Sequence, residues 1–192
     1  MAKRLDRIVV IDVEATCWQG EPPRGEVSEI IEVGACLLDP GSGEISEKAS
    51  VLVRPVRSRV SEFCTRLTTL TPEMVASGLA FRDACALLER AYGARDRPWA
   101  SYGDYDRLQF ERQCALEGVR YPFGPSHLNV KTLAALAQGR PGEVGLPDAL
   151  GDFGLDFRGV HHRGVDDAWN VARLLAATLR LGGRAAFDSE PF

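Results

Sequence analysis

The chain has 192 residues, of which 45% are hydrophobic and 26% are charged, and its net charge is −4. This length and composition are typical of one globular domain that buries about two-thirds of its unfolded surface. The negative charge argues against a protein that coats long nucleic acids, although binding a single strand end needs few phosphate contacts.

The spacing of the cysteines and the first residues of the chain indicate in which cellular compartment the protein resides. The five cysteines are scattered and include no Cys-x-x-Cys pair, which argues against a disulfide framework or a zinc site. The apolar run in MAKRLDRIVVID is too short for a signal peptide, and no later run could span a membrane. We therefore expect a cytoplasmic protein with reduced thiols and no membrane partner.

Three strands are predicted in the first part of the chain. The β-branched run in LDRIVVIDVEA predicts a buried strand that ends near Asp12 to Glu14. Residues 25–55 predict two further strands joined by the turn Pro40–Gly43, which makes a hairpin. A short strand is also expected within 97–103 and another strand edge at 127.

The rest of the chain predicts helices that alternate with these strands. Pro72 after Thr71 is typical of a helix start, and Gly93 is typical of a helix end. An antiparallel start followed by alternating elements predicts an α/β domain with one mixed central sheet flanked by helices. We expect one domain over residues 1–182 and a flexible tail over 183–192. The helices are predicted from 71 onward and at 80–93, 104–118, 127–139 and 166–183, the last stopping at its double glycine.

Two acids, Asp12 and Glu14, end the first predicted strand. Alternation along a strand puts both carboxylates on one face. Like charges so close raise each other's pKa unless a cation lies between them, and a hard divalent ion such as Mg²⁺ meets that need. The alternative is a solvated strand end with two surface acids.

A second acidic pair, Asp104 and Asp106, lies at a strand-to-helix junction. Aspartate is a preferred helix N-cap, and we expect Asp104 to act as the cap. Asp106 lies about one turn ahead of Phe110, on the side of the helix that meets the sheet. Asp106 can therefore reach the strand edge.

The stretch HHRGVDD holds two histidines ahead of two aspartates. The apolar stripe of the last helix, which includes Val171, runs back to Asp167 and not to Asp166. We therefore expect Asp167 to face the sheet and Asp166 to face solvent or cap the helix. The partner of Asp167 is then His162, which could exchange a proton with a bound water, while His161 is a bystander. An ordinary loop histidine is the alternative for His162.

In this order and spacing, Asp12-x-Glu14, Asp106 and His162-x4-Asp167 resemble the DEDDh 3′–5′ exonucleases, which are ribonuclease-H-like domains. The resemblance covers about residues 7–181. The segments DVEATCWQG, SEIIEVGACLLD, FCTRLTTLTPEMV and GVDDAWNVARL are similar to one subgroup. That subgroup contains the histone-mRNA and RNA-interference 3′ exonucleases and the bacterial KapD-like exonucleases.

The resemblance implies a ribonuclease-H-like mixed sheet and a metal-dependent enzyme. Its substrate would be the free 3′ end of RNA, or of short single-stranded DNA and oligonucleotides, and its product nucleoside 5′-monophosphates. It also implies two divalent ions, Mg²⁺ or Mn²⁺. Asp12, Glu14 and Asp167 would be direct ligands, Asp106 would hold the second ion, and His162 would activate the attacking water. The positions matching the sugar-holding and base-stacking residues of the family are Ala15, Thr16, Cys17, Phe63 and Tyr105.

An arginine-rich segment, VRPVRSRVSEFCTR, interrupts the otherwise acidic chain. Its arginines could follow substrate phosphates, or the segment could be a solvated loop. Arg163, next to His162, is a similar candidate for a phosphate contact.

A second function is compatible with the same fold. The chain could be a catalytically quiet exonuclease-fold domain that acts as a binding or regulatory partner. The presence of all five site residues favours the enzyme, because clustered acids repel one another when no metal is bound. The pattern leaves the oligomeric state and the choice between RNA and DNA open.

Overall fold

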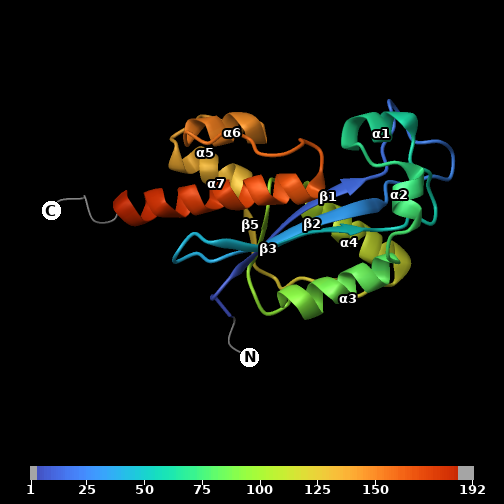
Figure 1. The fold of residues 1–192 in the computed structure, drawn as a ribbon, viewed down its shortest axis with the longest axis horizontal. Helices are drawn as coiled ribbons and strands as arrows, with labels where there is room; N and C mark the ends of the chain where they lie inside the picture. Colours follow the sequence, from blue (N-terminus) through green and yellow to red (C-terminus); the bar gives the residue numbers. More distant parts are fainter. Residues whose placement is uncertain (1–3, 186–192) are drawn as a thin grey trace.

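A five-stranded mixed sheet separates two layers of helices (Figure 1). The computed structural model describes residues 4–185. Strands β1, β2 and β3 are antiparallel neighbours, whereas β4 and β5 run parallel to β1. The predicted mixed sheet is therefore confirmed. In sheet order the strands are β3 (Ile45–Leu52), β2 (Ile30–Leu38), β1 (Ile8–Ala15), β4 (Trp99–Ser101) and β5 (His127–Asn129).

The helices cover the two faces of the sheet unequally (Figure 1). Helices α3 and α4 pack on the face that carries Val9 and Ile11, while α5, α6 and α7 pack on the face that carries Ile8 and Val10. Helices α1 and α2 pack around Ile31 in a smaller third cluster. The helices are α1 (Glu62–Thr68), α2 (Pro72–Ala76), α3 (Phe81–Tyr92), α4 (Tyr105–Glu117), α5 (Val130–Ala137), α6 (Leu146–Asp152) and α7 (Gly164–Ala185).

Several local signals in the sequence have the expected effect. The turn between β2 and β3 closes because the N–H of Gly43 donates to the Asp39 carbonyl at 2.8 Å. The Thr71 hydroxyl accepts the N–H of Met74 at 3.3 Å and caps α2, with Pro72 in its first turn. The left-handed Gly93 ends α3. The hairpin and these two helix boundaries are confirmed.

One predicted helix end is wrong, and two short helices were not predicted. Helix α7 does not stop at the double glycine but continues to Ala185, because a glycine inside a helix costs only about 1 kcal/mol. The rest of the predicted tail, 186–192, lies outside the described residues. The arginine-rich segment is not loop throughout, since Ser61 caps α1 from Glu62 onward. Helix α6, which was not expected, follows a Gly-Leu-Pro start.

The start of helix α7 lies in close contact with the sheet at Gly34 on β2. A Cβ atom at Gly34 would lie 1.9 Å from the carbonyl carbon and oxygen of Gly164, so only glycine fits there. Gly34 pairs with Asp12 in the β1–β2 register. This close approach brings the N-terminus of α7 to the acidic end of β1. Between residues 4 and 185, each helix is too short or too polar to cross a membrane.

Candidate active site

Three acids from two distant segments meet at the end of β1. Asp12 and Glu14 lie two residues apart on the strand and point to the face covered by α7. Asp167 lies in the first turn of α7 and is only 4% exposed, so it faces the sheet as predicted. Asp12, Glu14 and Asp167 each offer one oxygen atom, and these atoms all lie within 4.8 Å of one another. The structure thus brings together three of the predicted site residues.

Asp106 joins the same site from α4. Its Oδ1 accepts the N–H of Val13, the residue between Asp12 and Glu14, at 2.8 Å. Asp106 is 3% exposed, and its reach to the strand edge is as predicted. Asp104 occupies the N-cap position of α4, but its side chain makes no capping hydrogen bond. Its carboxylate instead pairs with Arg107 at 3.2 Å. The predicted position of Asp104 at the N-cap is therefore right, but the predicted capping hydrogen bond is absent.

Burial and mutual repulsion favour protonated forms of these acids when no cation is present. Burial, followed by the charge of Asp106, raises the pKa of Asp12 well above its ordinary value. Burial and the charge of Asp167 raise the pKa of Glu14 to about 8. Burial raises the pKa of Asp167 to about 7 and that of Asp106 to about 6.

The cluster fits a hard divalent cation. Neither carboxylate oxygen of Asp167 has a hydrogen-bond partner among the described residues, although both are buried. Buried carboxylates without partners are rare unless an ion satisfies them. Oxygen donors at this spacing suit Mg²⁺ or Mn²⁺, which prefer carboxylates and keep positions for water or phosphate.

Both histidines of HHRGVDD reach the site. His161 and His162 line one pocket together with the acids, and their ring centroids lie 4.0 Å apart. His161 Nε2 lies 3.7 Å from Asp167 Oδ1, so the structure does not leave His161 as a distant bystander. Burial and the neighbouring His161 lower the pKa of His162, which favours its neutral, proton-accepting form.

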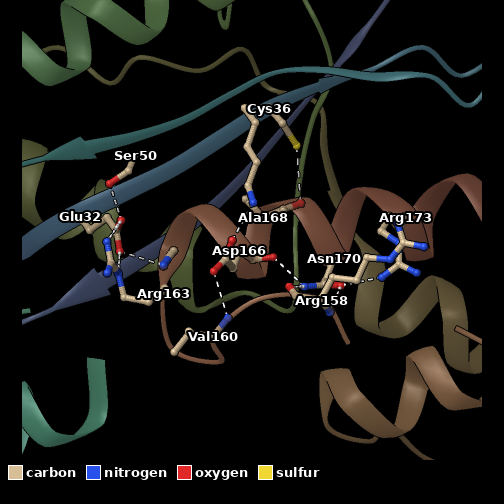
Figure 2. Close-up of polar contacts among 12 residues, drawn as sticks. Glu32, Cys36, Ser50, Arg158, Val160, Arg163, Asp166, Ala168, Asn170 and Arg173 are labelled. Carbon is tan, nitrogen blue, oxygen red and sulfur yellow. Dashed lines mark hydrogen bonds and ion pairs between the residues drawn. The ribbon is translucent and has the colours of Figure 1, made fainter. Parts of the chain in front are cut away.

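Asp166 and Arg163 have roles other than those expected. The Asp166 carboxylate lies at the partly exposed surface but does not cap α7, because it accepts the N–H of Val160 at 3.0 Å and pairs with Nζ of Lys48 at 2.6 Å. The Arg163 guanidinium turns inward and pairs with Glu32, so it is not placed to bind a phosphate (Figure 2). Both side chains therefore hold the loop instead of presenting charge to a ligand.

The pocket has a volume of about 410 Å³ and opens beside the acids. Three of the predicted substrate-binding residues, Ala15, Cys17 and Tyr105, lie in its wall, and Tyr105 is 55% exposed. Thr16 and Phe63 are not among the lining residues. Thr16 is fully buried and its hydroxyl accepts the N–H of Glu29 at 2.9 Å, which commits it to the backbone.

Other lining residues were not found from the sequence. Leu67 on α1 lies one helical turn after Phe63, so helical spacing from Phe63 could have indicated it. Tyr102 follows β4 directly and lies within the segment 97–103 that was expected to contain a strand. The segment Gly145–Pro147 enters the wall through α6, and its proline in the first helical turn is a helix-start signal that could have indicated this helix.

Comparisons with known proteins agree with this arrangement. The exonuclease family model of the RNase_T type matches residues 9–175. The 3′–5′ exonuclease Snipper of Drosophila melanogaster is 29% identical over 198 residues, covering 91% of this chain and 70% of that protein. The 3′–5′ exoribonuclease 1 of Rattus norvegicus is 32% identical over 187 residues, covering 92% of this chain and 54% of that protein. The chain thus spans about half the length of the rat relative.

A solved structure is similar over the whole domain. The nuclease domain of 3′hExo, described as a DEDDh family member bound to rAMP, superimposes with a TM-score of 0.83. The sequence identity is 28%, and the match covers 94% of each chain. The chain therefore belongs to the RNase_T exonuclease family, and its resemblance to the DEDDh type and the ribonuclease-H-like fold are confirmed. Its domain is that of a hydrolytic 3′–5′ exonuclease.

Proposed function

We propose that this chain is a metal-dependent exonuclease that shortens RNA from its free 3′ end and releases nucleoside 5′-monophosphates. Short single-stranded DNA and oligonucleotides would be lesser substrates. The observation that carries the proposal is that oxygens of Asp12, Glu14 and Asp167 lie within 4.8 Å of one another, while neither Asp167 oxygen accepts a hydrogen bond from another described residue. RNA is favoured because several relatives are named exoribonucleases and because the similar nuclease domain of 3′hExo is bound to rAMP.

Two divalent ions would be held by the four acids. Asp12, Glu14 and Asp167 would hold one ion, while Asp106, whose carboxylate accepts the N–H of Val13, would hold the second. When bound, such ions make a water molecule more acidic and stabilise charge on the phosphate and the leaving 3′ oxygen. Mg²⁺ and Mn²⁺ both suit these oxygen donors.

The other pocket residues would bind the end of the strand and move the proton. His162 lines the pocket with a lowered pKa, so its neutral imidazole can accept the proton of the attacking water. Tyr105 and Leu67 offer apolar surfaces for the terminal base, which suits a sequence-tolerant enzyme. The pocket wall at Ala15 and Cys17 would contact the terminal sugar.

The cysteines support a reducing compartment, and we place the protein in the cytoplasm. All five are free thiols, and four of them, Cys36, Cys64, Cys85 and Cys114, are buried. Free thiols persist where glutathione keeps proteins reduced.

The test uses single-stranded RNA and DNA labelled at either end, with Mg²⁺ or Mn²⁺ and with a chelator. We expect a 3′ label to leave as a mononucleotide at once, while a 5′-labelled strand shortens stepwise, only with metal. Asp12→Ala and Asp167→Ala should each lower kcat by at least about 10²–10³-fold. Asp104→Ala is the control and should leave kcat unchanged, because the exposed side chain of Asp104 lies outside the pocket.

Two outcomes would contradict the proposal. Absence of metal-dependent shortening from the 3′ end would instead favour a catalytically quiet domain that acts as a binding or regulatory partner. Unchanged mononucleotide release in Asp12→Ala or Asp167→Ala would show that the activity comes from another site or from a contaminant.

A further inference from the structure

Glu32 is a buried charge that the proposed reaction does not use. It lies directly opposite Glu14 in the β1–β2 register and has no exposed surface. Like charges opposite each other destabilise a sheet, and a buried carboxylate needs compensating partners. Glu32 is not in the group of acids whose oxygens meet within 4.8 Å in the described part of the chain. Its presence beside the site therefore needs another explanation.

Both oxygens of Glu32 are engaged by the loop that precedes α7 and by β3 (Figure 2). Arg163 donates from Nε to Oε2 and from Nη2 to Oε1, each at 3.3 Å, which forms a two-pronged contact. The N–H of Gly164 donates to Oε2 at 2.9 Å, and the Ser50 hydroxyl donates to Oε1. Because these donors occupy both oxygens, Glu32 is committed to holding the loop and not to binding an ion.

The loop that Glu32 holds carries the groups of the active site. His162 directly precedes Arg163, and the N–H of Asp167 donates to the Arg163 carbonyl at 2.9 Å. His162 also has a φ of 63°, a left-handed conformation that residues other than glycine rarely adopt. Such a conformation persists only where the surrounding structure restrains it.

The other end of the loop is restrained by Asp166 (Figure 2). The N–H of Val160 donates to Asp166 Oδ2 at 3.0 Å, and Lys48 Nζ lies 2.6 Å from Oδ1. Gly159 has a φ of 95°, and a Cβ atom there would lie 2.4 Å from the Asp166 carboxyl carbon. With the loop already held at residue 160, the contact at residues 163 and 164 determines where the histidine points.

We propose that Glu32 is a positioning residue, which acts through Arg163 and the Gly164 N–H to present His162 to the catalytic pocket. The inference rests on the proposed function, since its main consequence is measured through proton transfer by His162. Glu32→Gln keeps the side-chain shape but places an NH₂ group among donors. The loop should then relax, so that kcat falls while the contacts to the terminal nucleotide, and hence KM, are kept.

The decisive experiment is a double-mutant cycle on labelled RNA with saturating metal. We expect Glu32→Gln to lower kcat by about 10–100-fold and to leave KM within about twofold, the loss that is typical when a residue that orients a functional side chain is replaced. In a His162→Ala background the same change should lower kcat by less than about twofold, because the two residues act as a unit. Equal factors in both backgrounds would overturn the proposal and indicate a general structural role.

Two further variants separate positioning from stability. Asp6→Asn is the control, because it breaks a similar contact far from the acids. Asp6 lies just before the start of β1, and Arg97 donates to its two carboxylate oxygens at 3.1 and 2.8 Å. Asp6→Asn should lower Tm and leave kcat unchanged. Arg163→Lys, which keeps the charge, should retain more activity than Arg163→Gln. Wild-type activity in both Arg163 variants would contradict a role for the Arg163–Glu32 contact.

Imidazole NMR signals give a readout that does not depend on activity. The His162 signals, assigned by comparison with His162→Ala, should shift or broaden in Glu32→Gln and stay unchanged in Asp6→Asn. Unchanged His162 signals in Glu32→Gln would overturn the proposal. If the wild-type chain proves inactive, the proposed function fails, and these signals still decide whether Glu32 positions the loop.

Discussion

The four pocket acids are buried close together, so the stability of the metal-free protein depends on whether they carry protons. Asp12 and Glu14 come from β1, Asp106 from α4 and Asp167 from α7. Burial raises the pKa of each one, and neighbouring carboxylates raise the pKa of Asp12, Glu14 and Asp167 further. The folded protein without metal therefore keeps protons that the unfolded chain would release at the same pH.

The stability of the metal-free protein should consequently fall as pH rises. Raised carboxyl pKa values stabilise the fold fully below about pH 4, and this stabilisation is lost as pH passes through the folded values. Those values are about 7 for Asp167 and about 8 for Glu14. We expect the Tm measured in chelator to decrease from about pH 5 to about pH 8.

Metal and a neutral side chain should each reverse this loss. Mn²⁺ should raise Tm more at about pH 8 than at about pH 6, because the acids then lose fewer protons on binding. Asp167→Asn should raise the metal-free Tm at about pH 8 by about 3 °C, the shift produced by about 1 kcal/mol in a domain of this size. A metal-free Tm that does not change with pH would contradict this account.

The two adjacent histidines should contribute unequally to catalysis. His162→Ala should lower kcat by about 10²–10⁴-fold, the usual loss for a general base. His161→Ala should retain most activity, although His161 Nε2 lies 3.7 Å from Asp167, because the spacing in the family pattern selects His162. Steady-state kinetics on one RNA substrate compare the two variants, and an equal or larger loss in His161→Ala would reverse the assignment.

Among the helices and strands, the packing of α7 on β2 decides whether the site assembles. Gly34 lies opposite Asp12, and its missing side chain lets Gly164 rest on the strand. The Cys36 thiol donates to the Ala168 carbonyl at 3.6 Å and fixes the next turn of α7 (Figure 2). Asp167 therefore reaches Asp12 and Glu14 because this face of β2 carries small residues near the helix start.

Gly34→Ala should displace α7 and destabilise the fold. The new Cβ would lie 1.9 Å from the Gly164 backbone, and such overpacking costs about 1–3 kcal/mol or more. Gly151→Ala in α6 is the control, because a Cβ there meets nothing within 4 Å. It should leave stability unchanged or raise it by up to about 1 kcal/mol. Urea unfolding measures both, and a wild-type midpoint for Gly34→Ala would contradict the packing argument.

Across the whole molecule, a net charge of −4 coexists with an exposed basic segment. Arg54, Arg57 and Arg59 are exposed, and none forms an ion pair with another residue in 4–185. The backbone that carries them is held by buried Glu29, which accepts the N–H groups of residues 56, 57 and 58 at 2.7–3.0 Å. A fixed loop with unpaired arginines suits the phosphates of a strand whose 3′ end occupies the pocket.

Replacing these three arginines by glutamine should weaken binding of long strands. We expect KM for an RNA oligonucleotide to rise at low salt, with kcat unchanged. The slope of log(kcat/KM) against log salt should become shallower by about 0.7 for each phosphate that an arginine no longer neutralises. The matched control replaces three exposed arginines on the α3 side, Arg82, Arg90 and Arg120, and should not alter the slope. Equal slopes for both triple variants would show that the segment is only solvated surface.

Much of the fold and part of the site can be read from short-range patterns along the chain. Strand alternation places Asp12 and Glu14 on one face, and the apolar stripe of the last helix selects Asp167 over Asp166. These predictions succeed because each depends on residues within a few positions, where the geometry of a strand or helix is fixed by the backbone. The mixed sheet and its hairpin follow from signals of the same kind.

The remaining features depend on segments that meet only after folding. The Asp106–Val13 hydrogen bond joins residues 93 apart, and the Glu32–Arg163 pair joins residues 131 apart. No local pattern could show that Arg163 turns inward, that Thr16 is committed to the backbone, or that His161 reaches the pocket beside His162. Burial and close packing across the sheet decide these positions, because desolvated polar groups must find partners wherever the fold brings them. The local sequence therefore specifies the strand, the helix and their acids, while packing between layers arranges them into one site.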